Sequence, residues 1–187
     1  MSSQSACSRR ITLQVALTLV FTSGCGFMSG PSEYEKYMNR EKSFEKLVAS
    51  AGGNAKKEGK AMHGFKMVGW MIDLSGAELT DKLISQIIEV AQNEAIFDLN
   101  LSNTSITDDQ LAELDAGSVL QKTVNLNLAQ TSITDAGLDS LSNFYCLTSL
   151  NLKGSKATQE AAKRMGEKKI ANPQTPAPFK VQPKVEI

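Results

Sequence analysis

The sequence predicts an α/β protein of about four stacked units, each a short strand followed by a helix, with a helical cap before the first unit. Two nearly identical blocks, residues 99–108 and 126–135, carry this prediction. Each begins with Leu-Asn-Leu, and alternation along a strand points both leucines to one face. Each ends in Ile-Thr-Asp, where threonine can cap a helix and the acid suits the helix dipole. Such small units cannot bury a core alone, so we expect at least three to stack.

Length, charge and cysteines indicate one domain with tails. The 187 residues carry 20 Lys and Arg against 20 Asp and Glu, so no excess positive charge points to nucleic acid. The cysteines Cys7, Cys25 and Cys146 form no CxxC pair, which argues against a zinc site or a disulfide framework. We expect Cys146 to be a small buried residue. We expect no metal, cofactor or catalytic residue, because the motifs typical of such sites are missing from the sequence.

Residues 1–25 have the organisation of a secretory signal peptide. Arg9 and Arg10 form a positive start, residues 11–21 are apolar, and residues 22–24 are small. As a helix the apolar run would cover roughly 16 Å, which is too short for the roughly 30 Å hydrocarbon core of a bilayer. We therefore expect the chain to be exported.

The small residues before Cys25 resemble the lipobox of bacterial lipoproteins. In that family the cysteine is lipidated and becomes the first mature residue. The resemblance implies a lipid anchor at Cys25 and a place on the cell membrane or outer membrane, facing the periplasm or the exterior. Thr22 stands where the family usually has leucine. The alternative is free secretion, with cleavage near Gly24 or Gly26.

Residues 26–66 are predicted to hold a tether, a helix and a loop. Ser32 and Glu35 have the spacing of a capping box, which starts a helix that ends at Gly52. This helix either covers the open end of the first unit or stands free as a stalk. We favour the cap, because the ends of a stacked array need an element that hides the core. Residues 54–66, with four lysines, are interpreted as a solvated loop.

The units align on the second leucine of each strand, at Leu74, Leu101, Leu128 and Leu152. A column of small residues follows, whose hydroxyls are expected to satisfy backbone groups under the turn: Ala77, Thr104, Thr131 and Ser155. The helices are expected to start after Thr80, Thr107, Thr134 and Thr158.

The pattern Leu-x-Leu-x-x-Thr-x-Ile-Thr-Asp-x-x-Leu resembles the leucine-rich repeat family, in its ribonuclease-inhibitor or cysteine-containing type. The repeats are placed at residues 67–165. The resemblance implies a short solenoid with parallel strands on the concave side and helices on the convex side. It also implies recognition of a protein on the concave face, and it does not imply an enzyme.

Alternation along the strands selects the candidate binding residues of the concave face. They are Asp73, Asp98, Asn100, Ser102, Asn125, Asn127, Ser149, Asn151 and Lys153, with Ser75 at the edge. The alternative is a solvated face that binds nothing specific, because this column has no Trp or Tyr anchor of the kind that dominates protein interfaces.

Residues 166–187 contain four prolines and are predicted to be a disordered tail. The tail is interpreted as a spacer, and the Pro-Gln-Thr-Pro sequence at 173–176 leaves a ligand for a proline-binding domain as the alternative.

We expect a non-catalytic protein-binding module, exported and lipid-anchored, with an unknown protein partner, a membrane contact through the anchor and no nucleic acid. One alternative is a structural component of the cell envelope without a discrete ligand. Another is a substrate-recognition adaptor resembling F-box-type repeat proteins, against which the signal peptide argues.

Overall fold

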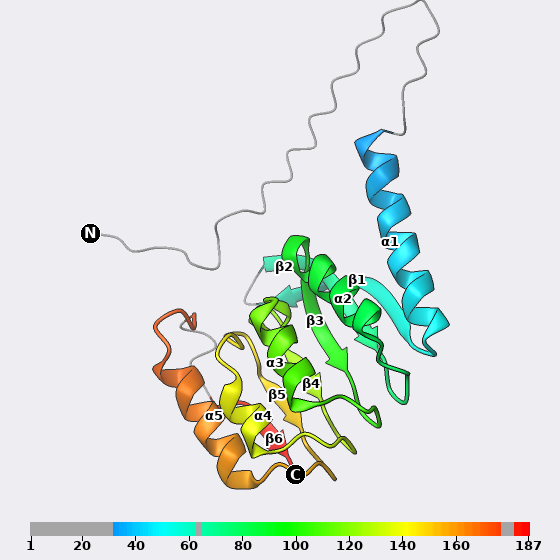
Figure 1. The fold of residues 1–187 in the computed structure, drawn as a ribbon. Coiled ribbons are helices and arrows are strands. Elements are labelled where there is room, and N and C mark those ends of the chain that lie inside the picture. Colours follow the sequence, from blue (N-terminus) through cyan, green and yellow to red (C-terminus); the bar gives the residue numbers. More distant parts are fainter. Residues whose placement is uncertain (1–31, 63–64, 177–181) are drawn as a thin grey trace, which may run out of the picture.

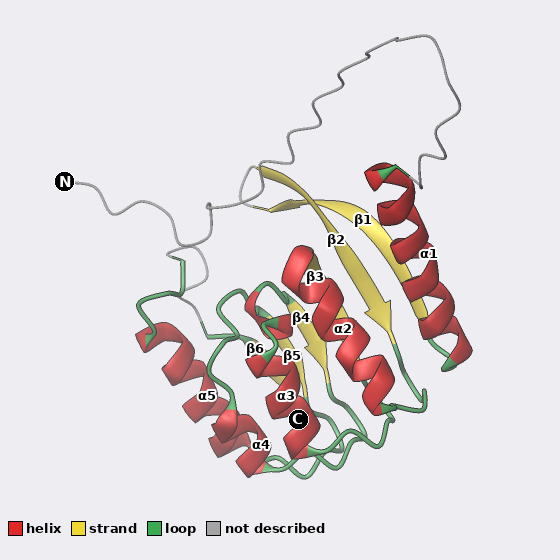
Figure 2. Cartoon of the chain, turned by 45° about the horizontal axis from the view of Figure 1, so that its top comes forward, coloured by secondary structure: helices red, strands yellow, loops and turns green. Residues whose placement is uncertain are grey.

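The computed structural model describes residues 32–62, 65–176 and 182–187. Over these residues the chain is an α/β fold with one six-stranded sheet in the order β1-β2-β3-β4-β5-β6 and helices on one side of it (Figures 1 and 2). The elements are α1 (Glu33–Ser50), β1 (Asn54–Met62), β2 (Phe65–Asp73), α2 (Asp81–Asn93), β3 (Ala95–Asn100), α3 (Asp108–Ala116), the 3-10 helix η1 (Val119–Gln121), β4 (Asn125–Asn127), α4 (Asp135–Ser140), β5 (Ser149–Asn151), α5 (Gln159–Ala171) and β6 (Lys184–Glu186).

The sheet is mostly parallel. β1 and β2 form an antiparallel hairpin, and β2 to β6 then run parallel to one another in chain order. The register keeps equivalent residues side by side, so Leu99 pairs with Leu126, Leu126 with Leu150, and Leu150 with Val185. Each parallel neighbour is thus reached through a crossover on the helix side.

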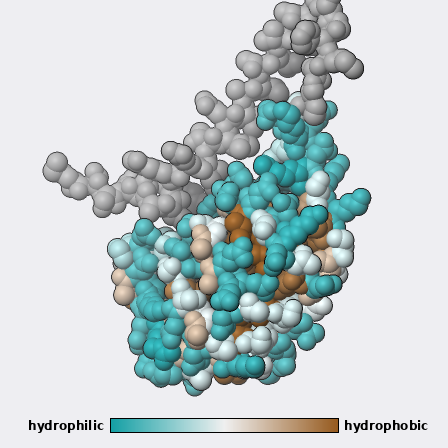
Figure 3. All heavy atoms as spheres, viewed as in Figure 1, coloured by the Kyte–Doolittle hydropathy of each residue, from teal (hydrophilic) through white to brown (hydrophobic). Residues whose placement is uncertain are grey.

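The strand leucines form the core, as predicted. The leucines of the repeated strands and the equivalent Ile72 lie between the sheet and the helices. Each of these side chains is at most 2% exposed: Ile72, Leu74, Leu99, Leu101, Leu126, Leu128, Leu150 and Leu152. The helices add apolar residues spaced to form one face, such as Leu83, Ile87 and Ala91 of α2. Their outward faces are polar, and mainly hydrophilic residues show on the helix side of the molecule (Figure 3).

The turns after the strands also repeat. A residue with left-handed backbone lies two positions after the second leucine in all four units, at Gly76, Asn103, Gln130 and Gly154. Two residues before each of these positions, the backbone amides of Leu74, Leu101, Leu128 and Leu152 donate to the next strand over 2.7–2.8 Å. The hydroxyls of Thr104 and Thr131 donate to the carbonyl three residues back, at 2.6 and 2.7 Å, as predicted for the small-residue column.

Each helix begins where the sequence predicts. Thr80, Thr107, Thr134 and Thr158 are the N-cap residues of α2 to α5, and each side chain accepts a hydrogen bond from a backbone amide of the first turn. Ser32 and Glu35 form the predicted capping box at the start of α1.

Helix α1 packs against the body of the protein. Its Phe44 and Val48 are buried in the same core as the strand leucines, and the Phe44 ring meets Trp70 of β2 edge-on, with centroids 5.1 Å apart. The helix therefore covers the β1–β2 end of the core, which agrees with the favoured cap rather than the stalk.

The loop predicted for residues 54–66 is wrong. Residues 54–62 form β1, the edge strand of the sheet, and pair with the whole of β2. Among residues 54–60 of β1 only Ala55 is buried, and Lys56, Lys57 and Lys60 leave the strand without a regular alternation of apolar residues. Charged residues are typical of edge strands, where they discourage pairing with another chain.

The disordered tail predicted for residues 166–187 is also wrong for the part that the structure describes. α5 continues to Ala171, and Thr175, which follows it, is buried and donates to the carbonyl of Lys169 at 2.8 Å. Residues 184–186 form β6, which pairs with β5. The local proline content does not prevent this, because Pro183 lies just before the strand and need not donate a ladder hydrogen bond.

Candidate functional site

The face of the sheet opposite the helices is the candidate site, and we call it the open face. It carries the polar residues that alternate with the buried leucines. Asp73 and Lys153 are exposed, and the other predicted residues are half-buried: Asp98, Asn100, Ser102, Asn125, Asn127, Ser149 and Asn151. The register brings seven of the nine into two rows, one from Asp73 through Asn151 and one from Asp98 through Ser149, while Ser102 and Lys153 lie just after the strands.

The first row holds the turns that follow the strands. The side-chain oxygens of Asp73, Asn100, Asn127 and Asn151 each accept from the backbone amide two residues later, over 3.0–3.1 Å. This Asx-type hydrogen bond satisfies backbone groups where the chain leaves the sheet. One role of the row is therefore structural.

Other predicted residues are occupied by contacts within the sheet. Asp98 accepts from Asn125 at 2.6 Å and from the Lys60 ammonium of β1 at 2.7 Å. Asn100 donates its amide to Asp73 at 2.9 Å. These pairs fix side-chain positions across neighbouring strands and leave fewer groups for a ligand.

Among the predicted residues of the open face, two amide groups remain available. The side-chain nitrogens of Asn127 and Asn151 have no acceptor among the described residues, while their oxygens are held by the turns. Their orientation is thus fixed, and their N–H groups are presented to solvent by half-buried side chains. Because these side chains are already held in place, an amide donating to a partner would lose little conformational entropy on binding.

Sequence reasoning missed both ends of the open face. Lys60 lies on a strand that was interpreted as a loop, and Lys184 and Glu186 continue the two rows beside Ser149 and Asn151. The order Lys184-Val185-Glu186 has the same polar-apolar-polar alternation as Asn125-Leu126-Asn127. That alternation is the signal that could have identified β6.

Lysines at both ends of the open face pair with neighbouring carboxylates. Lys60 pairs with Asp98 at 2.7 Å, and Lys184 pairs with Glu186 at 3.3 Å. Such partly or fully exposed ion pairs contribute little to the stability of the fold. They do reduce the net charge that the open face presents to a partner. The face has no charge pattern suited to a polyelectrolyte.

A second polar cluster joins α1 to the sheet. The Lys57 ammonium contacts Tyr37 and Glu41 of α1, and it lies 2.5 Å from the Glu94 carboxylate, which also accepts from the Trp70 indole at 2.7 Å. Burial alone would lower the pKa of Lys57, but hydrogen bonds to Glu41 and Glu94 hold it above its ordinary value. The polar groups of this cluster bond to one another rather than to solvent. We therefore interpret the cluster as a structural link between α1 and the sheet and not as a ligand site.

Other predicted features fall outside the site or outside the description. Cys25 lies outside the described residues. Cys146 is buried, as expected. In the part of the chain that the structure describes, no group of three or more His, Cys, Asp or Glu is arranged to hold a metal ion, and no helix is long and apolar enough to cross a membrane.

Comparison with known proteins assigns no family. A scan of the sequence against models of protein families finds no match, and a search of curated proteins finds no significant relative.

Proposed function

We propose that this chain is a short leucine-rich-repeat solenoid that binds a protein on its open face, without catalysis. The repeated geometry supports the proposal. Four left-handed turn residues, four threonine caps and four equivalent inter-strand hydrogen bonds recur with the period of the sequence blocks. A stack of identical turns places one row of side chains per unit on the sheet, which suits recognition of an extended surface.

The observation that carries the binding role is the pair of oriented amides at Asn127 and Asn151. They lie on adjacent strands, opposite each other in the register. A partner segment with carbonyl or carboxamide oxygens could accept from both. The charge balance of the face favours a neutral polar partner, and recognition through small polar side chains would be wet and of modest affinity.

We also propose that the chain is exported and held on a membrane by lipid on Cys25. One acyl chain alone binds a membrane only marginally, at about 0.8 kcal/mol per buried CH₂, so the two or more chains of a lipoprotein are needed for a lasting anchor. Mass spectrometry of the mature N-terminus tests this. An acylated Cys25 is the expected result, and an unmodified terminus at another residue would refute the anchor.

The binding role is tested with Asn127→Asp. This change keeps the oxygen that accepts from the Ala129 amide at 3.1 Å and removes the donor. Chemical cross-linking in intact cells, followed by purification of the full chain in detergent, is expected to give one stoichiometric partner with the unchanged protein and a several-fold lower yield with the variant.

The matched control is Asn93→Asp on α2. It makes the same chemical change at an exposed amide that faces its own helix, where the side chain donates to Glu89 at 3.2 Å. The control is expected to retain the partner. Equal yields for all three proteins would place binding elsewhere, and the absence of a stoichiometric partner would favour a structural role in the envelope.

A further inference from the structure

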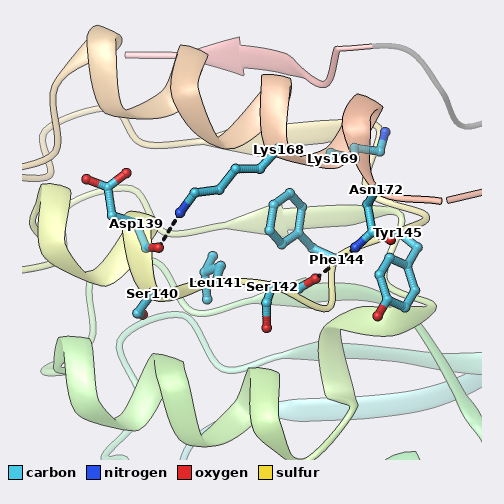
Figure 4. A pocket seen from close by; sticks show the side chains of 9 residues that line it. All are labelled: Asp139, Ser140, Leu141, Ser142, Phe144, Tyr145, Lys168, Lys169 and Asn172. Carbon is cyan, nitrogen blue, oxygen red and sulfur yellow. Dashed lines mark hydrogen bonds between the residues drawn. The ribbon is translucent and has the colours of Figure 1, made fainter. Parts of the chain in front are cut away.

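A pocket of about 310 Å³ opens between α4 and α5, on the side of the sheet away from the open face. Its apolar floor is formed by Leu141 and Phe144, which are 1% and 2% exposed. Lys168 of α5 and Asn172, which follows this helix, extend on either side of the Phe144 ring, Lys168 toward Asp139 of α4 and Asn172 toward Ser142 (Figure 4). The volume lies at the lower end of the range for small-molecule sites.

The pocket exists because the third unit is short. Equivalent strand residues are 27 apart between Asp98 and Asn125 but 24 apart between Asn125 and Ser149. The unit before has nine residues in α3 followed by η1, whereas α4 has six residues. Residues 139–145, all of which except Asn143 line the pocket, occupy the place where the preceding unit has the end of its helix and η1.

The segment that follows α4 and forms one wall of the pocket is fixed by hydrogen bonds to its backbone. The buried carboxylate of Asp115, 3% exposed, accepts from the backbone amides of Ser142 and Asn143 at 2.9 and 3.0 Å. On the other side, Asn172 donates to the carbonyl of Ser142 at 3.5 Å. A pocket whose wall is fixed in this way needs little reorganisation to accept a ligand.

The rim carries the Lys168 ammonium, for which the described residues offer no carboxylate within ion-pair distance, although its charge helps to lower the pKa of the nearby Asp139 carboxyl. The exposed ammonium of Lys168 donates to the backbone carbonyl of Asp139 at 2.5 Å, which is a neutral acceptor. The Asp139 carboxylate is instead held by Arg164, at 2.8 Å from its terminal nitrogen. The Lys168 ammonium, which lies beside the apolar floor, can therefore leave its hydrogen bond to the Asp139 carbonyl and bond to an anionic group instead.

We propose that the α4–α5 pocket binds a small organic carboxylate with an apolar body. The body lies on Leu141 and Phe144, and the carboxylate pairs with the Lys168 ammonium at the rim. This site is separate from the open face and does not depend on the protein-binding role proposed above.

The test uses 3-phenylpropionate as the probe and its neutral counterpart 3-phenylpropionamide, titrated into the isotopically labelled full chain and followed by NMR. Saturable shifts of amides in residues 139–145 and 168–172 are expected, with a Kd on the order of 1 mM for a ligand of this size. The amide should bind about three-fold more weakly, as expected for the loss of an exposed ion pair.

Three variants assign the charge effect. Lys168→Gln should lower the affinity for the carboxylate to that for the amide, and Lys168→Arg should restore the difference. Lys163→Gln, an exposed charge on the same helix that does not line the pocket, should change neither. Equal affinity of the two probes for the unchanged protein, shifts outside these two segments, or no saturable shift would each overturn the proposal.

Discussion

The carboxylate of Asp108 joins two successive units by accepting both hydrogen bonds that Thr134 offers, from its amide at 3.0 Å and from its hydroxyl at 2.6 Å. Thr134 is the N-cap of α4, and Asp108 lies in the first turn of α3. Asp135 repeats the contact with Thr158, over 2.6 and 2.9 Å. Gln159 stands at the equivalent position in the last unit, and no further helix follows α5 in the part of the chain that the structure describes. The Thr-Asp dipeptides at 107–108 and 134–135 thus start α3 and α4 and also connect each of these helices to the next.

We predict that Asp108→Ala lowers the free energy of unfolding by about 2 kcal/mol, because it removes two hydrogen bonds to a charged acceptor. Asp109→Ala is the matched control. Both acids lie in the first turn of α3, so both changes lose the same helix-dipole contribution, but Asp109 is exposed. Urea denaturation measures the difference. Equal losses in the two variants would show that the contact between units contributes nothing.

Gly137 of α4 gives a second test of the same contact. A β-carbon at this position would lie 2.3 Å from the Asp108 carboxylate. Alanine is normally better than glycine in a helix by about 1 kcal/mol, but here Gly137→Ala should destabilise the protein. In the Asp108→Ala background the same change should become neutral or stabilising. The double-mutant cycle measures this coupling, and additive effects would contradict it.

These contacts show where sequence reasoning succeeds. The leucines, the threonine caps and the small-residue column could be predicted because each repeats at a fixed offset and each has a local physical cause. The partner of Asp108 is 26 residues away, and its identity as a link required the stacking geometry.

The missed elements lie at the two ends of the sheet, where the repeat pattern changes. On β1 the inward positions hold Ala55 and Lys57, and a lysine can face inward only because Glu41 and Glu94 meet it from two other elements. On β6 one apolar residue, Val185, packs on the core.

Of the candidate site, the rows on the open face were predictable, but which amides are held and which are available depends on cross-strand contacts. The α4–α5 pocket follows from a shortened unit and an apolar floor that no motif marks.

The Lys57 cluster predicts a pH dependence. Burial would raise the pKa of Glu41, but hydrogen bonds from Lys57 and Tyr37 hold it below 4.5. A lowered folded pKa contributes stability that is present above about pH 4.5 and lost as pH falls through the folded value. We therefore expect Lys57→Met to cost about 2 kcal/mol at neutral pH, and the difference from the unchanged protein to shrink below pH 4.5.

Lys56→Met is the control for this titration. Lys56 is adjacent in sequence, its side chain is 60% exposed, and it pairs with an exposed Glu58. Its loss should cost far less than the loss of Lys57, because the pair is exposed to solvent. Urea denaturation at the two pH values separates the variants. A penalty for Lys57→Met that stays constant with pH would show that the cluster acts through packing alone.

The last prediction concerns β6, which supplies the final partner for the parallel sheet. The Leu152 amide donates to the Glu186 carbonyl at 2.7 Å, just as the Leu128 amide donates to Asn151 at 2.8 Å one unit earlier. Deleting residues 184–187 removes the first acceptor and leaves the second. We expect the Leu152 amide to exchange with solvent at least about tenfold faster in the truncated chain, which corresponds to about 1.4 kcal/mol of lost protection.

The Leu128 amide reports on the stability of the remaining sheet and should change much less. Hydrogen exchange followed by NMR measures both amides in one sample. Unchanged protection of Leu152 would mean that β6 does not hold the end of the sheet, whereas equal acceleration at both sites would mean that the strand stabilises the whole fold.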